Sequence, residues 1–135
     1  MSQFLVPNFQ DRAAYEKGLA DLFLEFTAGT SGAIPTSPTR ALGIVWSGVT
    51  LTATGLITIP LQMPWPFNII CVANVTQNSL SASTGMVCTP DKTTDVASAT
   101  APKIAFNLLT AAGARANMGT SDVFRMHAIL TNSKY

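Results

Sequence analysis

The pattern of apolar and polar positions divides the chain into an N-terminal helical part and a longer β part. In residues 9–28, apolar side chains recur at spacings of three and four, and charged side chains occupy the other positions. This spacing builds one apolar stripe along an α-helix. The stripe consists of Tyr15, Leu19, Leu22, Phe23 and Phe26. We therefore expect an amphipathic helix over 9–28, with Asn8 as its N-cap and Gly29 as its C-cap.

Beyond the expected helix, residues 29–40 are typical of a linker. Two glycines and two prolines, Gly29, Gly32, Pro35 and Pro38, stand among hydroxyl side chains, and this composition argues against a helix or a central strand. The predicted organisation is an arm over 1–8, the helix over 9–28, the linker over 29–40 and a β domain over 41–135.

The β domain is predicted from short runs that are rich in β-branched residues. We expect strands at 49–53, 56–59, 67–76, 86–88, 104–109 and 122–130. The loops between them lie at 77–85, 90–103 and 110–121, and the last of these leaves a helical turn open. Short strands with turn signals between them favour an antiparallel sandwich or jelly roll. The predicted fold class is mainly β: an antiparallel β-sandwich or jelly roll preceded by one N-terminal amphipathic α-helix.

The charges are few and unevenly placed. Only 11% of the residues are charged while 47% are hydrophobic, and no charged residue occurs between Ala41 and Pro90. A surface this poor in charge favours burial against identical copies or a larger assembly. The net charge of +1 gives no electrostatic case for a nucleic-acid partner. Prolines interrupt the apolar stretches, so we expect no membrane insertion.

Candidate chemistry is sparse. A catalytic His127 would need a carboxylate partner, but Asp122 lies about 16 Å away along a strand, so a structural histidine is favoured over a general base. Asp91 and Asp95 leave a glycosidase pair or a calcium loop open, with solvated loop residues favoured. Cys71 and Cys88 are expected as free thiols in a reducing cytosol, and a disulfide between them stays open. The sequence predicts no enzyme, no cofactor and no metal.

Trp65 stands between two prolines at the start of the longest predicted strand. Proline cannot donate to a strand ladder, so this segment is an edge or a lead-in. We expect Trp65 to contact a neighbouring subunit. A sugar-stacking platform with Trp46, Phe67 and Tyr135 stays open, as does ordinary packing.

Four segments carry a family resemblance: Gly55-Leu-Ile-Thr-Ile-Pro60, Met63-Pro64, the run FNIICVAN at 67–74, and VFRMHAI at 123–129. Over roughly residues 42–132 the chain resembles the C-terminal β-sandwich domains of bacteriophage tail fibres, which are typically homotrimers. Because one helix and a linker rather than a long shaft precede the β domain, the chain is more similar to trimeric capsid decoration (cement) proteins.

The resemblance implies a virion structural protein, made in the host cytoplasm. It would form a homotrimer through the helical stripe and Trp65, and it would attach to other phage structural proteins such as the major capsid protein. An apolar N-terminal arm containing Phe4, Leu5, Val6 and Phe9 would hold the virion, although packing of this arm on its own domain stays open. The alternative is a tail-fibre tip or receptor-binding module that recognises a host glycan through its three loops.

Overall fold

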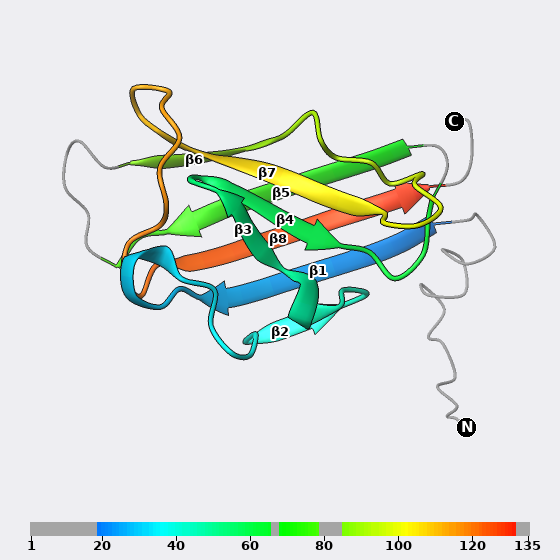
Figure 1. Ribbon diagram of the computed structural model, residues 1–135, viewed down its shortest axis with the longest axis horizontal. Coiled ribbons are helices and arrows are strands. Elements are labelled where there is room, and N and C mark those ends of the chain that lie inside the picture. The colour runs from blue at the N-terminus through cyan, green and yellow to red at the C-terminus, as the bar shows by residue number, and fades with distance from the viewer. Residues whose placement is uncertain (1–18, 66–67, 79–84, 132–135) are drawn as a thin grey trace.

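A computed structural model describes residues 19–65, 68–78 and 85–131. In this part the chain forms two four-stranded antiparallel sheets, of order β2-β1-β8-β5 and β3-β4-β7-β6 (Figure 1). The first sheet comprises β1 (Leu19–Thr27), β2 (Arg40–Leu42), β5 (Asn68–Thr76) and β8 (Val123–Thr131). The second comprises β3 (Thr50–Ala53), β4 (Leu56–Pro60), β6 (Met86–Pro90) and β7 (Lys103–Thr110). The prediction of a mainly β fold is therefore confirmed.

The predicted helix over 9–28 is wrong where the structure can test it. Residues 9–18 lie outside the described part, but Leu19–Thr27 form strand β1, which pairs with β8 along its whole length. The physical reason is an alternation of period two. Leu22, Leu24 and Phe26 are buried, whereas the residues between them face the other side of the sheet.

The remaining predicted strands are confirmed within a residue or two, as β3 to β8. Gly55 closes the turn between β3 and β4 with a φ of 66°, which is a left-handed conformation that glycine adopts without strain. Two features were not predicted. Arg40–Leu42 add the short strand β2 at the end of the linker, and short 3-10 turns form at Thr30–Gly32 and Trp46–Gly48. Within the described residues, 111–122 contain no helix.

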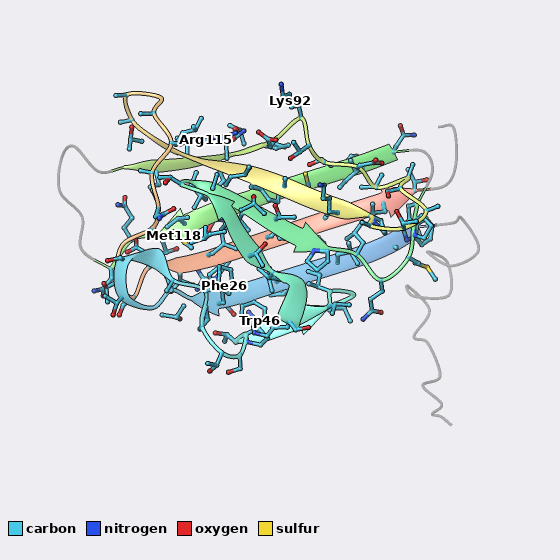
Figure 2. All side chains as sticks on the ribbon, viewed as in Figure 1. Phe26, Trp46, Lys92, Arg115 and Met118 are labelled. Carbon is cyan, nitrogen blue, oxygen red and sulfur yellow. The ribbon has the colours of Figure 1, made fainter. Side chains whose placement is uncertain are left out.

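The core lies between the two sheets and is centred on aromatic rings. Phe26 stacks on Phe124 with ring centroids 5.3 Å apart, and Phe106 meets Phe124 edge to face at 6.1 Å. Trp46 covers Phe26 from the side at 5.5 Å (Figure 2). All three phenylalanines are fully buried. Both sheets thus contribute to one continuous core, and their opposite faces are left for solvent or partners.

Cys71 on β5 and Cys88 on β6 carry free thiols that are half-buried against this core. Burial raises the pKa of the Cys71 thiol, and it raises that of Cys88 to about 11. Among the described residues, no helix has the length and apolar character needed to span a membrane.

Candidate functional site

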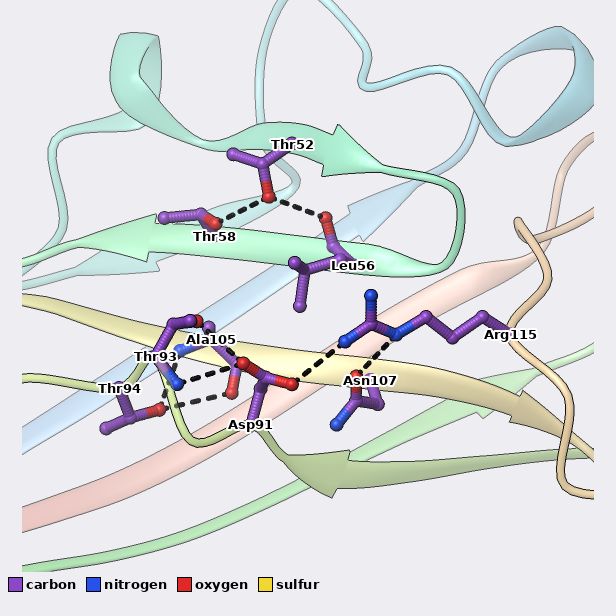
Figure 3. Close-up of polar contacts among 9 residues, drawn as sticks. All are labelled: Thr52, Leu56, Thr58, Asp91, Thr93, Thr94, Ala105, Asn107 and Arg115. Atoms are coloured by element: carbon purple, nitrogen blue, oxygen red, sulfur yellow. Dashed lines mark hydrogen bonds and ion pairs between the residues drawn. The ribbon is translucent and has the colours of Figure 1, made fainter.

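A polar cluster on the outer side of the second sheet surrounds Asp91, directly after β6 (Figure 3). One carboxylate oxygen of Asp91 accepts hydrogen bonds from the backbone N–H and the hydroxyl of Thr93, at 2.9 and 2.7 Å. The other accepts from Arg115 at 3.0 Å, and Arg115 also donates to the Asn107 side chain at 2.8 Å. The cluster ties the turn after β6 and the loop after β7 to the face of β7.

The chemistry of this cluster is that of a structural anchor. The hydrogen bonds from Thr93, with Asn107 and the charge of Arg115 adding to them, lower the pKa of Asp91 to about 2 against the opposing effect of desolvation. Both oxygens of the buried carboxylate already have partners. Asp95, expected as its possible companion, accepts instead from the backbone of Ala97 at 3.1 Å. In the described residues, no group of three or more His, Cys, Asp or Glu side chains could hold a metal ion.

His127 finds a carboxylate partner that the sequence did not suggest. Its Nε2 contacts the carboxylate of Asp21 on β1, the strand beside β8. Both side chains are more than half exposed, at 54% and 63%. Asp122, the carboxylate considered from the sequence, accepts hydrogen bonds from the backbone of Asn78 and Gly119. The cross-strand neighbours of His127 on its own face are Phe23 and Val72, and neither carries a nucleophile or a proton donor.

The most distinctive surface is the side of the first sheet that faces away from the core, called here the outer face. A transverse row of aligned residues, Leu42, Phe23, His127 and Val72, crosses all four of its strands. Ile129 and Ile70 lie opposite each other two residues further along. Leu42, Ile70 and Val72 are 61%, 69% and 65% exposed. His127, paired with Asp21, interrupts the apolar side chains in the middle of this face. Exposed apolar side chains gathered on one face of a sheet favour an interaction site.

The charges on the outer face are compensated within it. Glu25 is 7% exposed and receives two guanidinium groups: Arg125 at 2.7 Å and Arg40 at 3.0 Å. Burial raises the pKa of Glu25, but the hydrogen bond from Arg40 and the charges of both arginines outweigh burial and lower it. Arg40 also lies over the Phe23 ring, 4.9 Å from its centroid. These charged groups therefore enter a contact already paired, which reduces the desolvation that an interface would cost.

An apolar hollow of about 270 Å³ adjoins the outer face where β1 begins and β8 ends. Its walls include Leu22, Leu42, Leu61, Met63, Trp65 and Leu130. The backbone N–H of Trp65 donates to the carbonyl of Val96 at 2.6 Å, which fixes this lead-in to β5 against the loop after β6. Because Leu42 belongs to both, the hollow and the outer face form one continuous surface.

The residues expected at an oligomer interface lie in different places in the structure. Leu22 and Phe26 are buried in their own core, so neither is accessible to a second copy in this fold. Phe23 lies half-buried on the outer face, Leu19 begins β1, and Trp65 is half-buried beside the hollow. Tyr15 and the arm residues Phe4, Leu5, Val6 and Phe9 lie outside the described residues. The sequence signal for the outer face was present in the alternation of β1, β5 and β8, but strand order decides which residues become neighbours.

The loops expected at a receptor-binding tip lie at opposite ends of the sheets. Thr76 and Val123 are paired neighbours, so the segments that leave β5 and enter β8 share one end (Figure 1). The segment between β6 and β7 lies at the other end, where Val96 meets Trp65. A single tip therefore cannot use all three loops.

No family model matches the chain, and comparisons with curated proteins and with solved structures found no match either.

Proposed function

We propose that the protein is a non-catalytic structural component of a bacteriophage virion, a β-sandwich that decorates the capsid and stabilises it by binding neighbouring shell subunits. The observation that carries the proposal is the outer face, where each of the four strands carries an apolar side chain and the charged groups are already paired. Such a surface gains free energy when it is covered by another protein, and it offers little to a small polar ligand.

The attachment surface in this proposal is the β2 side of the outer face together with the adjoining hollow. Leu42 belongs to both, and the hollow can take an apolar side chain from the shell. The mechanism is mechanical: each bound subunit buries area between shell proteins and so resists internal pressure. A specific contact of this kind generally buries more than about 1,000 Å². The resemblance to phage β-sandwich modules supplies the choice of a virion as the larger assembly.

The test is binding of purified protein to undecorated phage particles. We expect Leu42→Lys to weaken binding at least about tenfold, because a lysine in an apolar contact must be desolvated without a partner. Val87→Lys is the matched control, since Val87 is similarly exposed, at 54%, but lies on the other sheet. Equal binding of both variants would contradict the assignment of this surface.

The arm is tested separately. Deleting residues 1–10 is expected to abolish attachment while the two sheets stay folded, as judged by an unchanged urea midpoint. A truncated protein that still saturates particles would show that the arm does not hold the virion.

The competing function, recognition of a host glycan, is decided by a glycan array. Binding of a defined sugar, abolished by Trp65→Ala, would favour a tail-fibre tip over decoration.

The modules that the chain resembles are homotrimers. A homotrimer stays a prediction for this chain, which a measurement of its mass in solution tests.

A further inference from the structure

Strand β5 forms an edge that lacks the protection seen at the other three edges of the two sheets. β2 has three residues, β3 has four with a break in register, and β6 has five and ends at Pro90. β5 runs for nine residues without a proline or a charged side chain. Proteins normally keep edges short, irregular, charged or proline-containing, because a long regular edge pairs with another strand. β5 is therefore long, regular, uncharged and free of proline, which are the properties of an edge strand that can pair with another strand.

One side of β5 pairs with β8 in unbroken register from Asn68 to Thr76. In the part of the chain that the structure describes, no other strand pairs with it: β6 lies nearby in the second sheet but pairs only with β7. Ile70 and Val72 on this edge are the two most exposed large hydrophobic side chains of the described residues. The edge thus combines a strand template with apolar side chains beside it.

We propose that β5 pairs antiparallel with β5 of a second copy of the chain, so that two first sheets join into one sheet across a two-fold axis at Cys71. In this register Ile70 lies opposite Val72 of the second copy, and Asn68 lies opposite Asn74. Apolar side chains meet apolar side chains and amides meet amides, twice over, as two-fold symmetry requires. The edge is complementary to itself, and this self-complementarity identifies the occupant as an identical chain.

Two further features favour the same arrangement. An uncharged strand places no like charges opposite each other when it pairs with its own copy. A register centred on Val72 would also keep every side chain on the same face of the joined sheet, because it shifts the pairing by two residues. It would place Ile70 opposite Asn74, which matches an apolar side chain with an amide. The register centred on Cys71 is therefore the one that the side chains select.

The first test is solution mass, measured by sedimentation equilibrium over micromolar to submillimolar concentrations. We expect the full chain to form a dimer, and Ile70→Lys to raise the dimer dissociation constant at least about tenfold, because an edge lysine opposes strand pairing. Leu42→Lys is the matched control: Leu42 is similarly exposed on the same sheet but lies at the opposite edge. A monomer, a trimer, or equal dissociation by the two variants overturns the proposal.

The second test reports the register. In a mixture of Ile70→Lys and Val72→Glu chains, the proposed register sets the new lysine opposite the new glutamate, while the other Ile70–Val72 pair stays native. Each variant alone should be monomeric at concentrations where the mixture is dimeric. If the mixture stays monomeric, the register is wrong and the proposal fails. Both substitutions lie on the exposed side of β5, and an unchanged urea midpoint verifies that each variant is folded.

This contact is independent of attachment to a virion. Leu42→Lys tests attachment and Ile70→Lys tests pairing, so either can fail while the other holds. Identical β5 edges join copies in pairs, and a two-fold contact of this kind competes with the homotrimer that the resemblance implies.

Discussion

Substitutions along β1 distinguish a strand from the helix that its sequence first suggests. A helix would place Phe23 on one stripe with Leu22 and Phe26 and would turn Leu24 away from it. The strand places Leu24 and Phe26 in the core and Phe23 on the outer face. The two arrangements therefore predict opposite orders of stability for Leu24→Ala and Phe23→Ala.

The magnitude for Phe26→Ala follows from the rings that surround its side chain. Phe26 is fully buried between Phe124 at 5.3 Å and Trp46 at 5.5 Å. Truncating a core phenylalanine to alanine costs about 3–5 kcal/mol, and each aromatic pair that the truncation removes accounts for about 0.5–1.5 kcal/mol beyond buried area. Leu24→Ala should cost about 2–5 kcal/mol. Both are large parts of a total stability of roughly 5–15 kcal/mol.

The assay is equilibrium unfolding in urea at neutral pH, followed by tryptophan fluorescence, since Trp46 lies beside Phe26. Phe23→Ala is the matched control: it removes a ring from the same strand, and because that ring lies beneath the Arg40 guanidinium on the outer face, the substitution should cost about 1 kcal/mol or less. If Phe26→Ala does not fold, Phe26→Leu should still cost at least about 1 kcal/mol, because it removes both aromatic pairs. A cost for Phe23→Ala that exceeds that of Leu24→Ala would refute the strand assignment of β1.

Two further predictions concern ionisable groups. The folded-state pKa of Asp91, about 2, lies below its ordinary value of 3.8. The stability that its charged form contributes is therefore present above pH 4 and is lost as the pH falls toward 2. When urea midpoints are measured over that pH range, Asp91→Asn should lose less stability than the native protein. Burial raises the pKa of the Cys88 thiol from 9.0 to about 11. In a Cys71→Ser variant, Cys88 should therefore react with iodoacetamide about a hundredfold more slowly in the folded protein than in urea. Equal reaction rates would show that the Cys88 thiol is accessible in the folded protein.

The strands after residue 49 were predictable because their signals are local. β-branched runs bounded by Gly, Pro and Asn mark β4, β5 and β7 regardless of what they pack against. β1 was not recognised because Leu22, Phe23 and Phe26 also fit a helical spacing. The alternation of Leu22, Leu24 and Phe26 was equally visible, and only pairing with β8 decides between the two patterns. Periodicity alone does not separate these structures in a short apolar run.

The candidate surface depended on strand order, which the sequence does not encode locally. His127 meets Asp21, and Glu25 meets Arg125, across about a hundred residues of chain, because β1 and β8 are neighbours in one sheet. From the sequence, Asp122 was the only carboxylate considered for His127, and the structure uses it to hold two loop backbones instead. Residue type identified which groups could interact, and topology determined which of them do.

The fold shows where the uncharged segment between Ala41 and Pro90 lies in the molecule. This segment provides β3 to β6, and part of its apolar content faces the core through Ile57 and Ile59. Of its exposed large hydrophobic side chains that the structure describes, Leu42 and the β5 residues Ile70 and Val72 lie on the outer face, next to paired charges from β1 and β8. The other three, Val45, Met63 and Val87, lie outside the strands of the first sheet. A chain that only needed solubility would place charges on an exposed edge strand. β5 has no charged side chain, whereas its neighbour β8 carries Arg125 and His127, and this difference supports the proposed pairing of β5 with an identical strand.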